Sequence, residues 1–579
     1  MTLSKRFSPV NTPGNATATP AFTPQKESPA IERSAPFDPL DPMMIPPAPA
    51  IVPSLRSLLL GFAFVFIAAP STAADAPEKP GSHSKLWGKS GELWSPTSRL
   101  SDFSMAGYRR GEESYRIPIA EISVKDFGAK ADDGHDDTDA FLRAIHAGKG
   151  KTIVVPAGRY HIDRPLEFHQ SGTVLRGAGS TQTLLVFSRG LEDIEPRPLK
   201  NDGGTETSDW SWRGGFVRVG SEIKGPARFP SHGSPLTQGA KRGDREIILQ
   251  QNDFRVGDEL VLHLRDDEHS SLVDYLYRGK SGDTRGLKGW TCRQIFRVRK
   301  IEGMRLTLDR PLRFDVRMEW SPTLTPFTPE VMDVGIEGIG FEFPAVLYPG
   351  HFRERGMNPL TFLATAAHCW ARDIHVRNGD NGPFIEGAAF CTLENIVLSA
   401  DAARIDRHGH TGHHGITIMG DDCLCRGFDL QARFIHDLTV QSAIGSVFAS
   451  GRAPDLAIDH HRWAPYENLF THIDAGEGTR LFESSGGGNR GLHTAAGATF
   501  WNIRTKRRPA WPSHLGPDQI QVVAVALNAP ESTSSEGRWF ENIPATEIIP
   551  QDLHSAMAAA ARAAVANAAT IKTEPSPPD

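Results

Sequence analysis

The sequence predicts an all-β fold in which short strands recur along most of the chain. Glycine and proline number 55 and 43 among 579 residues, and both favour turns over long helices. A turn-prone Gly, Asn or Asp also precedes an aliphatic residue at positions 22 to 42 residues apart, close to one coil of a solenoid with or without a loop insertion. This irregular spacing argues against a propeller or a leucine-rich horseshoe. The pairs are Gly338-Ile339, Asp373-Ile374, Asn395-Ile396, Asp437-Leu438, Asn468-Leu469 and Asn502-Ile503.

Charge and cysteine content exclude several functions. The formal net charge is -6, so there is no global basic field and we expect no nucleic-acid partner. The five cysteines are too few for a disulfide scaffold in a chain of this length. Any attraction for an anionic partner must therefore be local.

The first 76 residues contain two segments that are expected to precede the mature protein. Residues 1–50 are rich in Pro, Ser, Thr and Ala with little apolar periodicity, which indicates disorder or a misassigned start. Residues 51–76 hold Arg56, an apolar run over 58–69 and a small-residue site at 74–76, the arrangement of a secretory signal peptide. The run is too short to span a bilayer comfortably, and an uncleaved anchor is the alternative. We expect a secreted or periplasmic protein with no membrane contact after cleavage.

A short helix is expected after an extended segment over 77–120. Asp136, Asp137 and Thr138 supply N-terminal caps for it. A buried strand at 153–155 follows, and then a turn. The apolar face of the helix consists of Ala140, Phe141, Ala144 and Ile145.

This region carries a resemblance to a known family. The stretch VKDFGAKADDGHDDTDAFLRAIH, from Val124 to His146, together with the strand and turn from Gly150 to Ile162, resembles the first coil of the pectin-lyase-like superfamily. The resemblance implies a single-stranded right-handed parallel β-helix over 121–545, with a short N-terminal helix capping the first coil. It says little about the substrate.

Two segments are expected to elaborate the β-helix. Residues 190–330 contain alternating strand patterns at 254–264 and 295–308, which predict a β-rich elaboration of the early coils. Residues 546–579 predict a C-terminal helix, alanine-rich over 551–569, that covers the last coil and ends in a disordered tail.

A histidine-rich segment is the strongest candidate for chemistry. Seven of the 22 histidines fall between residues 408 and 461. Because residues one coil apart stack on the same face of a β-helix, histidines distant in sequence are expected to converge. Nearby arginines make this strip locally basic. The histidines are His408, His410, His413, His414, His436, His460 and His461, and the arginines are Arg404, Arg407, Arg452 and Arg462.

The resemblance implies an acidic polysaccharide substrate, since members of this superfamily commonly cleave such chains. β-Elimination on a uronic acid needs a cation for the carboxylate, a base for the C5 proton and an acid for the leaving oxygen. We expect an arginine, a neutral histidine and a tyrosine in these roles. The catalytic candidates are His413, His414, His436, His460, Arg462 and Tyr466. The substrate-binding candidates are Arg353, Arg404, Arg452, His461 and Glu467.

Several alternatives remain open at this stage. One is a hydrolase of polygalacturonase type that uses the paired carboxylates in G420-D-D422, although the histidine motif there stands in the wrong order. Another is a non-catalytic carbohydrate-binding β-helix. We expect no cofactor and a monomer, with calcium at Asp459 and Glu467 as an alternative. Zinc is disfavoured at His460 and His461, because adjacent residues of a strand face opposite sides.

Overall fold

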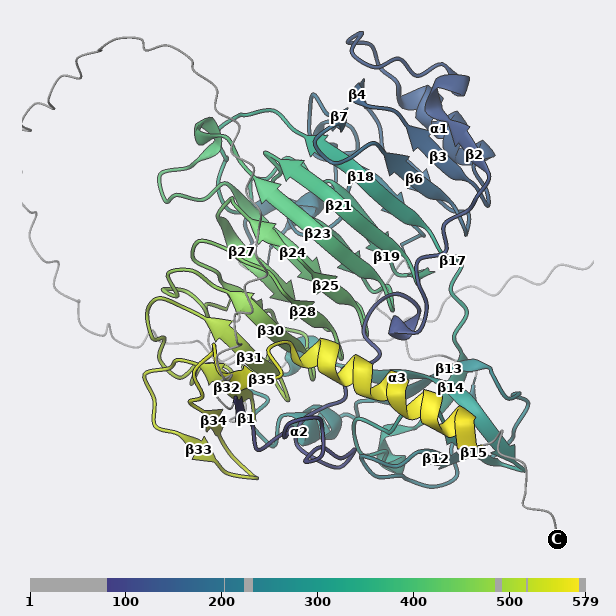
Figure 1. Ribbon diagram of the computed structural model, residues 1–579, viewed down its shortest axis with the longest axis vertical. Coiled ribbons are helices and arrows are strands. Elements are labelled where there is room, and N and C mark those ends of the chain that lie inside the picture. Colours follow the sequence, from purple (N-terminus) through teal and green to yellow (C-terminus); the bar gives the residue numbers. More distant parts are fainter. Residues whose placement is uncertain (1–80, 202–203, 223–232, 485–491, 517–518, 572–579) are drawn as a thin grey trace, which may run out of the picture. The chain divides into compact units, whose positions relative to one another are not determined.

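The computed structural model describes residues 81–201, 204–222, 233–484, 492–516 and 519–571 (Figure 1). The expected disordered start, signal peptide and C-terminal tail lie outside these residues. Among the helices that the structure describes, none is long and apolar enough to cross a membrane.

Two parallel sheets form the main body. We call them the short sheet and the long sheet, with seven and sixteen strands in the described chain. The chain alternates between them, from β19 (Leu360–Leu363) to β21 (Trp370–Arg377), β22 (Phe384–Glu386), β23 (Thr392–Ser399) and β24 (Gly412–Ile418), and these strands pair in parallel within each sheet. This path is a parallel β-helix and confirms the predicted fold (Figure 1).

The short sheet contains β5 (Leu166–Phe168), β10 (Val217–Val219), β19 (Leu360–Leu363), β22 (Phe384–Glu386), β24 (Gly412–Ile418), β27 (Phe434–Val440) and β29 (Ile458–His460). The long sheet contains β2 (Glu121–Ser123), β3 (Thr152–Val155), β4 (Gly158–His161), β6 (Val174–Gly177), β7 (Thr183–Val186), β18 (Gly335–Glu342), β21 (Trp370–Arg377), β23 (Thr392–Ser399), β25 (Leu424–Arg426), β26 (Asp429–Leu430), β28 (Val447–Ala449), β30 (Leu469–Asp474), β31 (Thr499–Arg504), β32 (Gln521–Val525), β33 (Ser532–Thr533) and β34 (Trp539–Glu541).

The turn-prone residues of the predicted repeat mark bends within the long sheet. Asp373, Asn395 and Asn502 have φ values of 51°, 54° and 51°, in the left-handed region that short polar side chains tolerate better than most. The aliphatic residues after them stack in register, with Ile374 paired to Ile396. The repeat is thus confirmed for these coils.

Two members of the predicted repeat occupy other positions. Leu438 lies in the short sheet, where it pairs with Ile416 and Ile458. Leu469 lies in the long sheet but before the bend, paired with Val447. A turn-prone residue followed by an aliphatic one does not distinguish the corners of a coil.

The capping helix has the predicted apolar face. Helix α1 (Thr138–Ala147) buries all four residues expected there: Ala140, Phe141, Ala144 and Ile145. Its first turn is held by Asp136, whose Oδ1 accepts a hydrogen bond from the Thr138 backbone N–H at 2.9 Å.

An antiparallel subdomain, residues 234–326, is inserted between β10 and β18. Its sheet runs β11-β16-β13-β14-β15-β12, and the predicted alternating segments are β13, β14 and β15. It has its own apolar core, which Ile444, Ala464 and Tyr466 of the β-helix complete. The elements are β11 (Ser234–Pro235), β12 (Glu246–Ile248), β13 (Glu259–Arg265), α2 (Ser271–Leu276), β14 (Thr291–Glu302), β15 (Arg305–Leu308) and β16 (Thr323–Pro326). Three small pairs are β1 (Ser82–His83) with β35 (Ile548–Ile549), β8 (Pro198–Lys200) with β9 (Glu206–Ser208), and β17 (Val331–Met332) with β20 (Ala366–Ala367).

The C-terminal helix does not cover the last coil, so that prediction is wrong. Helix α3 (Leu553–Ile571) begins beside the long sheet, near β30, and runs towards the antiparallel subdomain (Figure 1). The Leu553 backbone N–H donates to Thr471 Oγ1 at 3.0 Å, and Arg426 donates to Ser555 Oγ at 3.0 Å. The physical reason is that outward-facing apolar side chains of the long sheet, such as Val447, pack against the helix.

Candidate functional site

Five histidines gather on the outer side of the short sheet. His414 and His436 are direct partners on β24 and β27, with ring centroids 5.1 Å apart. The His413 ring lies 4.1 Å from that of His414 and 5.5 Å from that of His436. We call His351, His413, His414, His436 and His461 the histidine cluster.

Fixed acceptors orient the rings. His413 Nδ1 lies 2.9 Å from the carbonyl oxygen of Ser211, which only accepts, so Nδ1 carries the proton and Nε2 the lone pair. Asp459 Oδ2 lies 3.5 Å from His436 Nδ1 and 3.3 Å from His461 Nδ1. The carboxylate of Asp459 is fully buried beneath these rings.

The inner rings of the cluster are neutral near pH 7. Burial, followed by repulsion from the other histidines, lowers the pKa of His413 and His414 well below the ordinary value. Burial also lowers the pKa of His436, although Asp459 opposes this shift. Neutral imidazoles can accept a proton or bind a metal cation.

His351 joins the cluster from a loop and was not predicted. Its ring stacks on Phe352, with centroids 3.7 Å apart, and meets the His413 ring edge-on at 4.5 Å. Of this loop, only Arg353 was predicted from the sequence as a site residue. The only indication in the sequence was that this loop directly precedes the coil of β19. The path of the loop itself cannot be predicted from its residues.

A buried acid and a tyrosine stand beside the cluster and were also missed. Tyr348 donates a hydrogen bond to Glu354 Oε1 at 2.5 Å, and that oxygen lies 3.4 Å from His413 Nδ1. Burial raises the pKa of Glu354 to about 7. A carboxyl group that changes its charge near neutral pH therefore contacts an imidazole of the cluster.

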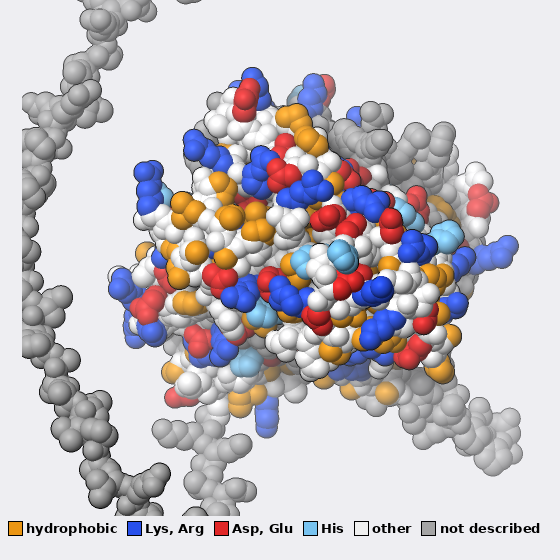
Figure 2. All heavy atoms as spheres, turned by 90° about the horizontal axis from the view of Figure 1, so that it is seen from above, with side chains coloured by type: hydrophobic (Ala, Val, Ile, Leu, Met, Phe, Trp, Pro, Cys, Tyr) orange, Lys and Arg blue, Asp and Glu red, His pale blue; other side chains and the backbone are white. Residues whose placement is uncertain are grey.

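Two hollows flank the loop that carries His351. One has a volume of 780 Å³ and includes Tyr348, His351, His408 and His410, and the other has 710 Å³ and includes Glu354. Arg353 lines both, so the structure places this predicted substrate-binding residue beside the cluster. On the face shown in Figure 2, basic and acidic side chains alternate rather than form a patch of one sign.

His460 is not part of the cluster, and its predicted catalytic role is wrong. Its side chain is fully buried, with the rings of Phe470 and Phe500 at 5.2 and 5.5 Å. His461 faces the other side and contacts Asp459. The predicted alternation of these two neighbours is confirmed, because one ring enters the core and the other joins the cluster.

Tyr466 and Glu467 lie at the boundary with the antiparallel subdomain, so their predicted roles are also wrong. Tyr466 belongs to the core of that subdomain. Glu467 is buried and pairs with Arg242 and with Arg313 at 3.4 Å. It contributes nothing to a calcium site with Asp459, whose carboxylate contacts histidines instead.

Three predicted arginines have other partners. Arg404 is buried, pairs with Asp380 and donates to the Thr411 carbonyl at 2.7 Å. Arg452 is exposed and pairs with Asp429 at 2.7 Å. Arg462 acts electrostatically on His493. The predicted roles of these arginines in neutralising or binding a uronate are therefore not supported.

The paired carboxylates of the hydrolase alternative are structural. Asp421 is buried and pairs with Arg293 at 3.0 Å. Asp422 pairs with Arg310 and Arg313, both at 2.7 Å. Both carboxylates are thus neutralised by arginines at the boundary with the antiparallel subdomain, an arrangement that favours a structural role over an acid and base pair.

Part of the chain is similar to known proteins. Residues 121–210 match the family described as rhamnogalacturonase A/epimerase, pectate lyase-like. Alginate lyase 7 of Azotobacter vinelandii is 31% identical over 99 residues, which are 16% of this chain and 12% of the relative. Mannuronan C5-epimerase AlgE4 of the same organism is 24% identical over 179 residues, 29% of this chain and 32% of the relative. The chain thus spans a minor part of the curated relatives it matches.

Solved structures are similar at lower identity. The tailspike protein gp49 from Pseudomonas phage LKA1 aligns over 72% of both chains at 14% identity, with a TM-score of 0.37. An exopolygalacturonase from Thermotoga maritima aligns over 71% of this chain and 82% of its own at 10% identity, with a TM-score of 0.34.

The fold and the matching segment together define the class. The described chain is a parallel β-helix protein. Its residues 121–210 match a pectate lyase-like family model, in agreement with the resemblance at the capping helix.

Proposed function

We propose that the protein is a secreted polysaccharide lyase that cleaves a uronic-acid-containing chain by β-elimination at the histidine cluster. The observation that carries this proposal is the convergence of neutral imidazoles beside a carboxyl group with a pKa of about 7, with His351 and Glu354 each lining a surface hollow. The similarity of a segment to an alginate lyase and to mannuronan epimerases supports a uronate substrate.

The reaction has a defined proton balance. A neutral imidazole of the cluster removes the C5 proton of the uronate, and the electron pair forms the C4–C5 double bond as the C4–O bond breaks. The imidazolium that results then passes this proton to the leaving oxygen and returns to its neutral form. Glu354 contacts His413 Nδ1 and orients that ring beside His414, and exposed Arg353 receives the uronate carboxylate.

The test is incubation with pectate, alginate, glucuronan and glycosaminoglycan chains. Ultraviolet absorbance of the unsaturated product and reducing ends are measured together. A lyase produces both, and a hydrolase produces reducing ends alone. If neither appears but deuterium from the solvent enters at C5, the protein is an epimerase, because it returns the proton without breaking the chain. Hydrolysis, epimerisation or the absence of all three signals each rejects the proposal.

Variants locate the reaction. His414→Ala is expected to lower kcat by roughly 10²- to 10⁴-fold, the usual contribution of a general base. The matched control is His375→Asn, since His375 lies on the long sheet and contacts Ser399 Oγ at 2.7 Å. If kcat falls equally in the two variants while circular dichroism is unchanged, the reaction does not take place at the histidine cluster.

A further inference from the structure

We propose that His351, His413 and His436 form a binding site for one divalent transition-metal ion, with zinc as the best fit. One ring nitrogen of each lies within 4.8 Å of the other two. Three imidazoles with an open fourth position are the ligand set of a catalytic zinc site. The inference deepens the proposed function, on which its catalytic meaning rests.

Two of the rings contact the kind of acceptor that usually supports a metal-binding histidine. Ligating histidines usually donate their other N–H to a carbonyl or a carboxylate, which fixes the ring and strengthens the ligand. His413 has the Ser211 carbonyl at 2.9 Å, and His436 has the buried Asp459 carboxylate at 3.5 Å. Both contacts use Nδ1, so Nε2 of each ring is the nitrogen left to bind the ion.

A small movement of one side chain would bring the three nitrogens to bonding distance from one ion. Tetrahedral bonds of 2.0–2.1 Å place ligand nitrogens about 3.3 Å apart, closer than the 4.8 Å limit within which these atoms lie. His413 and His436 stand on neighbouring strands, whereas His351 is exposed on a loop. Rotation of the His351 side chain is therefore the step that brings the third ligand in.

The ligand chemistry selects the ion. Calcium prefers carboxylate and carbonyl oxygens, and here Glu354 and Asp459 contact Nδ1 atoms of the rings and so act as supports. The five cysteines are all buried as free thiols, and none belongs to this group. Imidazoles alone suit zinc, copper or nickel, and zinc accepts the tetrahedral arrangement without redox chemistry.

The ion would supply a positive charge among the rings themselves, in addition to the charge of exposed Arg353 beside them. The predicted cations Arg404 and Arg452 are paired with Asp380 and Asp429 instead. A uronate carboxylate oxygen in the open position would be neutralised by the ion, which acidifies the adjacent C5–H. His414 and His461 lie outside the three ligands, and His414, with its ring 5.1 Å from that of His436, is the imidazole that would take the proton.

Metal binding is tested on the full chain without any substrate. The protein is stripped with a chelator, dialysed and loaded with Co²⁺ or Zn²⁺, and metal content and the Co²⁺ visible spectrum are measured. We expect one ion per chain. His351→Ala and His436→Ala should weaken binding at least 100-fold, and Asp459→Asn by about 10- to 100-fold. His169→Ala and His375→Asn, at histidines that pair with Glu167 and Ser399, are matched controls that should bind as the unchanged protein does.

The outcomes separate this inference from the proposed function. No retained ion, or equal binding by His351→Ala, His436→Ala and the controls, overturns the metal site whatever the activity. One ion lost only in the ligand variants supports it, even if no polysaccharide is cleaved, and in that case the proposed function alone fails. Circular dichroism of each variant confirms that the fold is intact.

Discussion

At the scale of single residues, the direction of a side chain decides whether a histidine serves chemistry or packing. His460 and His461 are neighbours in sequence, yet one packs against Phe470 and the other contacts Asp459. Burial lowers the pKa of His460 to about 4. Among the described residues neither of its ring nitrogens has a hydrogen-bond partner, so the ring behaves as an apolar group.

We expect His460→Leu to keep full activity and to improve stability in acid. A histidine whose pKa is depressed on folding loses its stabilising contribution as pH falls, here from about 6.5 to about 4. The variant has no such group, so relative to the unchanged protein it should gain up to about 3 kcal/mol between pH 7.5 and pH 4. Urea denaturation at both pH values measures this gain.

The control for that variant is His169→Leu, an exposed histidine with 55% of its side-chain surface accessible, which should show no gain. Loss of polysaccharide cleavage by a folded His460→Leu protein would return His460 to the candidate site.

Site residues that lie on strands could be predicted from the sequence, whereas site residues that lie on loops could not. His413, His414 and His436 were predicted because residues one coil apart stack. His351 and Glu354 come from a loop, whose path depends on contacts with chain far away, such as Ser211 near His413. Arg404 and Arg452 were wrongly predicted as substrate-binding residues because each guanidinium pairs with a carboxylate that lies near it in the fold. No local sequence pattern shows which carboxylate that is.

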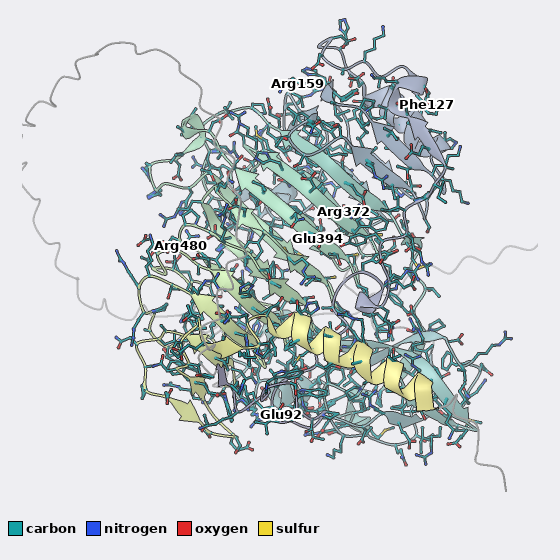
Figure 3. All side chains as sticks on the ribbon, in the orientation of Figure 1. Glu92, Phe127, Arg159, Arg372, Glu394 and Arg480 are labelled. Atoms are coloured by element: carbon teal, nitrogen blue, oxygen red, sulfur yellow. The ribbon has the colours of Figure 1, made fainter. Side chains whose placement is uncertain are left out.

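At the scale of elements, the strand register places alternating positive and negative side chains in a row across the outer face of the long sheet. We call this row the charge ladder. Arg176, Glu337, Arg372, Glu394 and Arg426 are direct partners on β6, β18, β21, β23 and β25. Figure 3 shows Arg372 and Glu394 on neighbouring strands. Alternating charges directly opposite each other stabilise a sheet, and like charges would destabilise it.

Glu337→Gln should lower the free energy of unfolding by about 1 to 2 kcal/mol. Glu337 is buried and lies 3.0 Å from Arg176 Nε and 2.9 Å from Arg372 Nε, so the amide leaves two cations without their shared carboxylate. Chemical denaturation at neutral pH measures the change. Asp429→Asn is the control, because its partner Arg452 is 70% exposed and such pairs contribute less than about 1 kcal/mol. Equal effects would mean that the ladder adds no stability.

Elements were predicted better than their placement. The capping helix and strands β13 to β15 follow from apolar periodicity, which is local. The position of α3 cannot be predicted from local periodicity. An alanine-rich helix has a weak apolar face, and its position depends on where the sheet presents apolar side chains.

At the scale of the whole described chain, a buried ionic network joins the β-helix to the antiparallel subdomain. The β-helix contributes Asp422 and Glu467, and the subdomain contributes Arg242, Arg310 and Arg313. Burial raises the pKa of Asp422, but the two arginines beside it outweigh burial and the net pKa lies below the ordinary value. The network therefore keeps its charges and fixes the insertion against the coils.

Asp422→Asn tests whether this network stabilises the protein. Removing one buried partner leaves Arg310 and Arg313 undercompensated, and we expect a loss of about 3 to 5 kcal/mol at pH 7. Because a depressed carboxyl pKa contributes stability above the unfolded pKa and loses it as pH falls, the difference from the unchanged protein should shrink below about pH 4. Denaturation curves between pH 3.5 and 7 measure it. A catalytic Asp422 would give the opposite result, a variant as stable as the unchanged protein but inactive. That result would remove the network as a support of the fold and reopen the paired-carboxylate mechanism.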